Sequence, residues 1–184
     1  MSRTELDDNL IQRMAGGDGN AFGEFYDRTS AAVYGFALSI LRNKEDAEDL
    51  MHDTYIRAYS GAVSYTPQGK PMAWLLTIVR NLCYNKLRAG TMSEDLADYE
   101  DPAGLDEFDA TLDRIVLEKA MQILSFEERQ IVMLHSLTGL KHREIAELLE
   151  IPLGTVVSKY NRSLKKIRRE LEEEERGKEG SDHA

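Results

Sequence analysis

The sequence predicts an all-α protein built of two small helical bundles joined by a flexible acidic linker. Apolar residues recur at spacings of three and four along most of the chain, and the alternation typical of strands is nearly absent. An acid-rich segment containing Pro102 and Gly104 separates two such helical groups. At 184 residues and 42% hydrophobic content, the chain is large enough for one ordinary domain or two small ones.

The elements follow in chain order. Helices are expected near residues 4–14, 20–41, 44–60 and 71–88, with breaks at residues 16–19, 42–43 and 61–69. These form an N-terminal domain over residues 1–90, followed by a linker over 91–111 and a C-terminal domain over 112–175, with a disordered tail at 176–184. In the C-terminal domain, a capping box from Ser125 to Glu128 predicts a helix that Thr138 and Gly139 close.

Charge is strongly segregated along the chain, whose net charge is −10. Residues 61–91 contain four basic and no acidic side chains, whereas residues 92–113 contain nine acidic and no basic ones. Residues 139–171 are basic again, with eight basic against four acidic side chains. Two positive stretches on an acidic chain predict two contact sites for phosphate.

The second basic stretch has the spacing of a helix-turn-helix. A short helix with apolar Ile145 and Leu148, a turn holding Pro152, and a second helix with Val156 and Tyr160 facing inward match that motif. The second helix is expected to enter the major groove of duplex DNA. The side chains expected to contact it are Arg143, Thr155, Ser158, Lys159, Arg162, Lys165 and Lys166, while Arg168 and Arg169 share the outward face. The alternative is a basic, solvated helix packed on a bundle.

The first basic stretch combines an apolar stripe with a face that mixes cations, an amide and an aromatic ring. Such a mixture suits unpaired strands, whose bases stack on rings while cations follow the backbone. The candidate residues are Lys70, Trp74, Thr77, Arg80, Asn81, Tyr84 and Arg88. The alternative, favoured for Trp74, is that the aromatic residues belong to the core or its boundary. Cys83 has no second cysteine to pair with and is expected to be a small buried hydrophobe.

Several segments together resemble one known family. They are Ala21-Phe22-x-x-Phe25-Tyr26-Asp27, Val33-Tyr34, Asp46-Ala47-Glu48-Asp49-Leu50, Trp74-Leu75-x-x-Ile78-x-x-Asn81, Glu144-Ile145-Ala146 and Ile151-Pro152-x-Gly154-Thr155-Val156-x-Ser158. They resemble the group IV, extracytoplasmic-function sigma factors of the sigma-70 family, in the family's order. The resemblance covers residues 21–88 and 112–171, and it implies a sigma-2-like and a sigma-4-like bundle.

The resemblance implies a promoter-recognition subunit of bacterial RNA polymerase. The first bundle would dock on the clamp helices of the largest subunit through residues 44–59, with Asp46, Glu48, Asp49 and Asp53 as contacts. It would open the minus-ten element, and the loop 65–70 with Arg80, Asn81 and Tyr84 would capture an extruded base. The second bundle would read the minus-thirty-five element as duplex and meet the polymerase flap.

The resemblance further implies regulation and the absence of catalysis. The acidic linker would run through the active-site cleft and RNA exit path of the polymerase. An anti-sigma factor, often anchored in the membrane, would cover both the polymerase-binding and DNA-binding faces. Neither a catalytic site nor a metal or other cofactor is implied. Glu150 stands where the family's turn often has Gly, Lys159 where Arg is usual, and Val157, Asn161 and His52 also depart from the pattern.

Two other functions remain open from the residues alone. Acidic side chains gather on the helix 44–60, where Asp49-x-x-His52 imitates half of a di-iron site, although no second carboxylate-x-x-His accompanies it. A DNA-binding regulator that acts without polymerase would also use a helix-turn-helix.

The sequence also predicts where the protein acts. The N-terminus lacks an apolar signal segment, and the apolar run 73–79 is far shorter than the roughly 20 residues that span a bilayer, so a cytoplasmic protein is expected. The resemblance implies a bacterial protein that only an anti-sigma factor would hold at the membrane.

Overall fold

The computed structural model describes residues 6–90, 119–120 and 122–181, and the chain divides into two compact units, Met1–Asp101 and Pro102–Ala184. Every regular element in these described ranges is helical, which confirms the predicted all-α class. The predicted linker and the expected start of the second helical group near Leu112 lie outside the described residues. No helix among the described residues is both long and apolar enough to cross a membrane.

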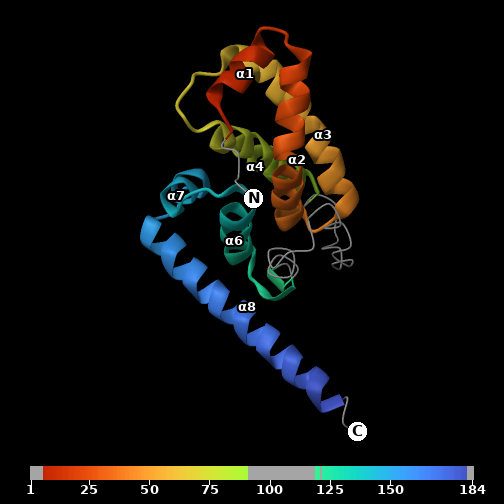
Figure 1. Cartoon of the computed structure of the whole chain (residues 1–184), viewed down its shortest axis with the longest axis vertical. Helices are drawn as coiled ribbons and strands as arrows, with labels where there is room; N and C mark the ends of the chain where they lie inside the picture. Colours follow the sequence, from red (N-terminus) through yellow and green to blue (C-terminus); the bar gives the residue numbers. More distant parts are fainter. Residues whose placement is uncertain (1–5, 91–118, 121, 182–184) are drawn as a thin grey trace. The chain divides into compact units, whose positions relative to one another are not determined.

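The N-terminal unit contains the four predicted helices. They are α1 (Asp8–Ala15), α2 (Gly19–Leu41), α3 (Lys44–Gly61) and α4 (Pro71–Gly90), with a short 3-10 turn, η1 (Ala62–Ser64), after α3 (Figure 1). The first helix begins later than the sequence suggested, because Asp7 is its N-cap and accepts a hydrogen bond from the Asn9 amide at 3.1 Å. Asp18 and Asn43 cap α2 and α3 in the same way.

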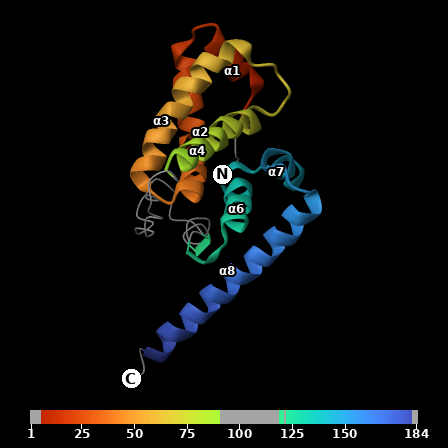
Figure 2. The same cartoon turned by 180° about the vertical axis from the view of Figure 1, so that it is seen from behind.

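The core of this unit lies where α2 and α3 run side by side and α4 crosses them (Figures 1 and 2). Phe25 and Phe36 of α2 and Leu75 of α4 are fully buried there. The Tyr55 hydroxyl of α3 lies 2.6 Å from the Thr29 hydroxyl of α2, so the buried polar groups at this contact are paired. Cys83 is buried, as predicted, and burial raises the pKa of its thiol to about 12.

The C-terminal unit contains α6 (Phe126–Thr138), α7 (His142–Leu149) and α8 (Leu153–Ser181). The predicted capping box is present at the start of α6, where the Ser125 amide donates to Glu128 Oε2 at 3.2 Å. Gly139 ends α6 with φ 70, a left-handed conformation that glycine adopts without a steric cost. A buried cluster containing Val132 of α6 and Ile167 of α8 joins these two helices.

The helix-turn-helix consists of α7 and α8. Glu150 ends α7 in the left-handed conformation with φ 58, and the Ile151 amide donates to the Ala146 carbonyl at 3.1 Å. Pro152 then precedes α8 and accepts from the Val156 amide at 3.2 Å. The helix continues to Ser181, so the expectation of a disordered tail is wrong as far as Ser181; Glu, Lys and Arg are good helix formers that prolong it.

Candidate nucleic-acid interfaces

The first candidate surface is a stripe along α4, here called the α4 face. Its members are Thr77, Arg80, Asn81, Tyr84 and Arg88. Thr77, Asn81 and Arg88 are exposed, while Arg80 and Tyr84 are partly buried. The guanidinium carbon of Arg80 lies 5.2 Å from the centroid of the Tyr84 ring, within the range of a cation–π contact. The face therefore presents a cation stacked over an aromatic ring, and Asn81 lies on the same stripe of the helix.

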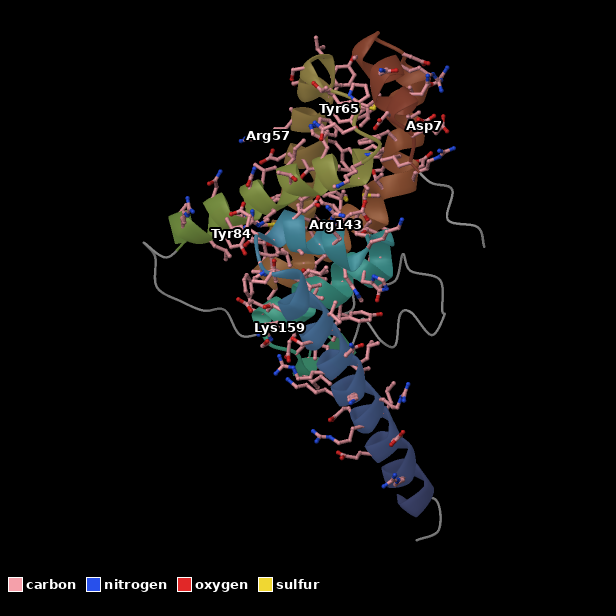
Figure 3. The ribbon with its side chains drawn as sticks, turned by 90° about the vertical axis from the view of Figure 1, so that its left-hand side faces the viewer. Asp7, Arg57, Tyr65, Tyr84, Arg143 and Lys159 are labelled. Atoms are coloured by element: carbon pink, nitrogen blue, oxygen red, sulfur yellow. The ribbon has the colours of Figure 1, made fainter. Side chains whose placement is uncertain are left out.

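The other two predicted residues of this surface lie at the N-terminal end of α4. Lys70 is exposed just before the helix, and Trp74 is partly buried, with its ring centroid 4.9 Å from that of Tyr65. Trp74 is thus a boundary aromatic residue packed against the loop that precedes α4. In Figure 3, Tyr65 lies near the start of α4 and Tyr84 towards its end. Tyr84 follows Trp74 by ten positions, which corresponds to about 15 Å along the helix.

The acidic residues predicted to bind polymerase lie on α3. Glu48, Asp49 and Asp53 are exposed, whereas Asp46 is partly buried and forms an ion pair with Lys86 of α4, Oδ1 to Nζ 2.5 Å. The structure therefore separates Asp46 from the other three by giving it a partner inside the unit. In the described part of the chain, no group of three or more His, Cys, Asp or Glu side chains is arranged to hold a metal ion.

The second candidate surface lies on α8 and is here called the α8 face. Its members are Thr155, Ser158, Lys159, Arg162, Lys165 and Lys166. Ser158, Arg162, Lys165 and Lys166 are exposed, and Thr155 and Lys159 are partly buried. The Ser158 hydroxyl donates to the Thr155 carbonyl at 3.1 Å. Figure 3 labels Lys159 on α8 and Arg143 on α7, where Arg143 pairs with Glu147. The structure thus brings the predicted cations onto neighbouring helices of one unit.

Two lysines of the α8 face are held by acids at the start of α6. Lys159 Nζ lies 2.6 Å from Glu127 Oε2, and Lys166 Nζ lies 2.8 Å from Glu128 Oε2. Burial alone would raise the pKa of Glu128, but hydrogen bonds from Lys166 and from Ser125 together hold that pKa below its usual value. Glu128 is therefore a charged partner. Phosphate would have to compete with these carboxylates for both lysines.

Aromatic rings from all three helices meet beneath the helix-turn-helix. The ring centroids of His135 on α6, His142 on α7 and Tyr160 on α8 lie between 4.7 and 5.0 Å from one another. His135 Nδ1 lies 2.9 Å from the Leu140 carbonyl oxygen. Burial, followed by the neighbouring His135, lowers the pKa of His142. The cluster joins α8 to both other helices, and it favours the neutral form of the His142 imidazole.

Sequence reasoning missed three sets of residues: the two acids on α6, the histidine pair, and Asp8. Asp8 accepts hydrogen bonds from residues 57 and 61 positions away, a separation that periodicity does not address. Glu127 and Glu128 were recognised only as first-turn residues of a capping box, although two acids facing a basic helix in a compact domain are a weak signal for ion pairs. His135 and His142 carried no pattern of their own.

Comparison with known families assigns both units. The family described as "Sigma-70 region 2" matches residues 25–91, which include α3, α4 and most of α2. The family described as "Sigma-70, region 4" matches residues 114–167, which include α6, α7 and the first half of α8. The two matches follow one another in the chain and together take in both the α4 face and the α8 face.

Similar whole proteins agree with this assignment. The chain is 29% identical to the ECF RNA polymerase sigma factor SigK of Mycobacterium sp. strain KMS, over 90% of each chain, and 29% identical to that of Mycobacterium tuberculosis, over 88% of this chain and 91% of the other.

Two solved structures share the fold. CnrH, in complex with the cytosolic domain of CnrY, has a TM-score of 0.63 at 21% identity, covering 90% of this chain and 97% of the other. RpoE of Bartonella quintana, in complex with the anti-sigma factor NepR, has a TM-score of 0.65 at 23% identity, covering 81% and 97%. From these region matches and relatives, the chain belongs to the sigma-70 family and is an extracytoplasmic-function RNA polymerase sigma factor.

Proposed function

We propose that this sigma factor binds core RNA polymerase and directs it to promoters by using its two candidate faces for two different forms of DNA. The α4 face holds the non-template strand of the minus-ten element after it opens, and the α8 face reads the minus-thirty-five element as duplex. The observation that carries this proposal is that each unit presents a cationic helix face. Each face lies within residues that match a sigma-70 region. The chain itself performs no bond chemistry.

The side chains of the α4 face suit single-stranded DNA. A base that leaves the duplex exposes a flat ring that can stack on Tyr84, and such stacking contributes about 1–3 kcal/mol per base. Arg80 sits over the same ring and carries the charge that attracts the backbone. Asn81 supplies an amide that can donate to and accept from a base edge. Lys70 and Arg88 are exposed before and near the end of the helix, where phosphates of a strand following α4 would pass.

The α8 face suits duplex DNA for a different reason. Its long cations project from one helix that a short turn sets against α7, the arrangement with which helix-turn-helix proteins enter the major groove. Arg162 and Lys165 are exposed and well placed for phosphate or base edges. Lys159 and Lys166 join them when DNA phosphates replace Glu127 and Glu128 as their partners. The Arg143 side chain adds a cation from α7.

Polymerase binding is assigned mainly to α3. Exposed Glu48, Asp49 and Asp53 offer carboxylates to the clamp helices of the largest subunit. Asp46, which pairs with Lys86, contributes by fixing α3 against α4 rather than as a free contact. The C-terminal unit meets the polymerase flap. Because polymerase and promoter are its partners, the protein acts in the bacterial cytoplasm.

An anti-sigma factor is the proposed inhibitor. RpoE, which shares this fold, is in complex with the anti-sigma factor NepR, and CnrH is in complex with the cytosolic domain of CnrY. A regulator that covers α3 and the DNA-binding faces would prevent both polymerase and promoter binding. If that regulator spans a membrane, it also holds this chain there.

The direct test is to mix the purified chain with core polymerase and follow co-migration, then transcription from a pool of templates with random upstream sequence. Co-migration and enrichment of two separated sequence elements are expected. A triple variant of Glu48, Asp49 and Asp53 to the corresponding amides is expected to weaken co-migration, whereas Glu172→Gln, an exposed acid on α8, serves as the matched control. A chain that binds DNA by itself but never joins core polymerase would instead be an independent regulator.

A further inference from the structure

One carboxylate of α1 closes the loop that precedes α4. The Tyr65 hydroxyl donates to Asp8 Oδ1 at 2.5 Å, and the Gly69 amide donates to Asp8 Oδ2 at 2.7 Å. The two oxygens of Asp8 therefore hold the two ends of a five-residue segment. Figures 1 and 2 show this loop lying beside α1, between η1 and α4.

The loop lies at the surface of the unit. Residues 66–70 are all exposed, and Gly69 has φ 67, which a side-chain-bearing residue rarely adopts. Tyr65 is fixed on its other side by Trp74, whose ring packs against it and also lies near Gly61. Burial, and then the hydrogen bond to Asp8, raise the pKa of Tyr65, so its hydroxyl remains a donor at neutral pH. Asp8 thus bonds both ends of an exposed loop from a helix outside that loop.

We propose that Asp8 is a positioning residue for promoter recognition: its carboxylate holds residues 65–70 in the conformation that accepts one extruded base of the minus-ten element. This inference rests on the proposed function and on the expectation from the family resemblance that the loop 65–70 helps to capture the extruded base. Asp8 need not touch DNA, because it is bonded to Tyr65 and Gly69. Base preference at one promoter position would then depend on a residue of the N-terminal helix.

Base preference depends on the fraction of molecules in which the loop 65–70 has the productive conformation. A pocket that distinguishes bases by hydrogen bonds needs its donors and acceptors held within about 0.5 Å of the productive positions. If the loop occupies that conformation only part of the time, the affinity for the preferred base falls in proportion to the occupied fraction. Binding to polymerase does not fall with it, since those contacts lie on α3, and among the phosphate contacts only Lys70 belongs to the loop while Arg80 and Arg88 lie on α4.

The experiment uses the full chain with core polymerase and a set of promoters that carry each of the four bases at every non-template minus-ten position. Asp8→Asn keeps the size of the side chain but gives it an amide in place of one acceptor oxygen. Asp7→Asn is the matched control: it removes the same charge from the adjacent residue and leaves an oxygen able to cap α1. Tyr65→Phe removes one of the two bonds from the loop side.

Asp8→Asn is expected to reduce the ratio between the best and worst base at one position by about tenfold, with co-migration with core polymerase and melting temperature equal to those of Asp7→Asn. Tyr65→Phe should reduce the same ratio, and the double variant should be little worse than Asp8→Asn alone, because both act on one contact.

Three results would overturn the inference. If the wild-type chain shows a base preference that Asp8→Asn retains within about twofold, the loop does not need Asp8 and only the inference fails. If Asp8→Asn lowers transcription equally for all four bases, its role is merely structural. If the wild-type chain gives no promoter-dependent initiation, the proposed function fails and this inference with it.

Discussion

The two candidate faces obtain positive charge in different ways. On the α4 face, Arg80 lies over the Tyr84 ring of the same helix, and residues 61–91 contain no acidic side chain. On the α8 face, Lys159 and Lys166 are already paired with Glu127 and Glu128 of α6. The first face combines charge with a ring that a base can stack on. The second consists of long cations, two of which are neutralised by acids of their own unit.

This difference matches the two forms of DNA that the proposed function assigns to the two faces. A captured base needs a fixed aromatic partner, and its affinity depends on stacking more than on salt. A duplex offers regularly spaced phosphates, so binding depends on cation number and falls steeply as salt rises. Under the proposed function, the acids that pair with two of the cations would also suppress binding to arbitrary DNA, because only a well-fitted site supplies enough contacts to displace them.

The largest effect is expected on the α4 face. Tyr84→Ala should weaken binding of the polymerase complex to a single-stranded minus-ten oligonucleotide by roughly 30-fold, because stacking of one base contributes about 2 kcal/mol. Asn85→Ala, at the adjacent exposed position, removes a side chain without a ring and should leave the affinity nearly unchanged. Fluorescence anisotropy measures both. Equal affinities for the two variants would show that Tyr84 does not contact a base.

The next effect concerns Arg162 on the α8 face. Arg162→Ala should weaken binding to a duplex minus-thirty-five element about tenfold and reduce the slope of log affinity against log salt by about one. Arg176→Ala, exposed further along α8, removes the same charge as a control. A salt titration of both variants measures the slope. If Arg176→Ala has the same effect, the charge of the unit matters and not the position of Arg162.

A smaller effect of opposite sign is expected at Glu127. Glu127→Gln releases Lys159 for phosphate and should tighten binding to the duplex element about threefold, since a partly exposed ion pair contributes less than about 1 kcal/mol. Glu172→Gln changes the net charge equally without touching Lys159. If both variants tighten binding to the same extent, the α6 acid has no specific role.

The smallest effect is a pH dependence confined to the C-terminal unit. Because the pKa of His142 is lowered by burial and by His135, the unfolded chain binds a proton before the folded one does. The free energy of unfolding should therefore fall as pH drops below the ordinary value of 6.5, and stay level above it. Thermal melts at about pH 7.5 and about pH 5.5 measure this.

Two substitutions locate that pH dependence. His142→Gln should remove much of it, whereas His52→Gln, at an exposed position on α3, should retain it. Glu128 does not interfere, since its lowered pKa places its titration in more acidic solution. A C-terminal unit that melts at the same temperature at both pH values would contradict the role given to the His135, His142 and Tyr160 cluster.

The local features of this fold could be predicted from the sequence. Apolar spacing located α2, α3 and α4, and the capping box and Gly139 located both ends of α6. These features depend on residues within a few positions of each other, which is the range that periodicity and capping rules describe. The turn at Glu150 is also a local feature. Its φ of 58 lies in the left-handed conformation that favours glycine, the residue that the family often has at this position.

Long-range pairing could not be predicted in this way. The sequence identified Lys159 and Lys166 as cations on an outward face, but not that α6 places Glu127 and Glu128 against them. It placed Asp46 among polymerase contacts, although the packing of α3 on α4 brings it to Lys86. Nothing local to Asp8 indicates Tyr65 or Gly69. Such contacts depend on tertiary packing, and they adjust the strength and selectivity of sites that local patterns locate.

The two faces are proposed to read different forms of DNA, and one measurement tests this division most directly. The polymerase complexes of the wild-type chain, Tyr84→Ala and Arg162→Ala are each titrated with a single-stranded minus-ten oligonucleotide and with a duplex minus-thirty-five oligonucleotide. Tyr84→Ala should lose affinity for the single strand alone, and Arg162→Ala for the duplex alone. If either variant weakens both ligands equally, the two faces do not divide the promoter in this way.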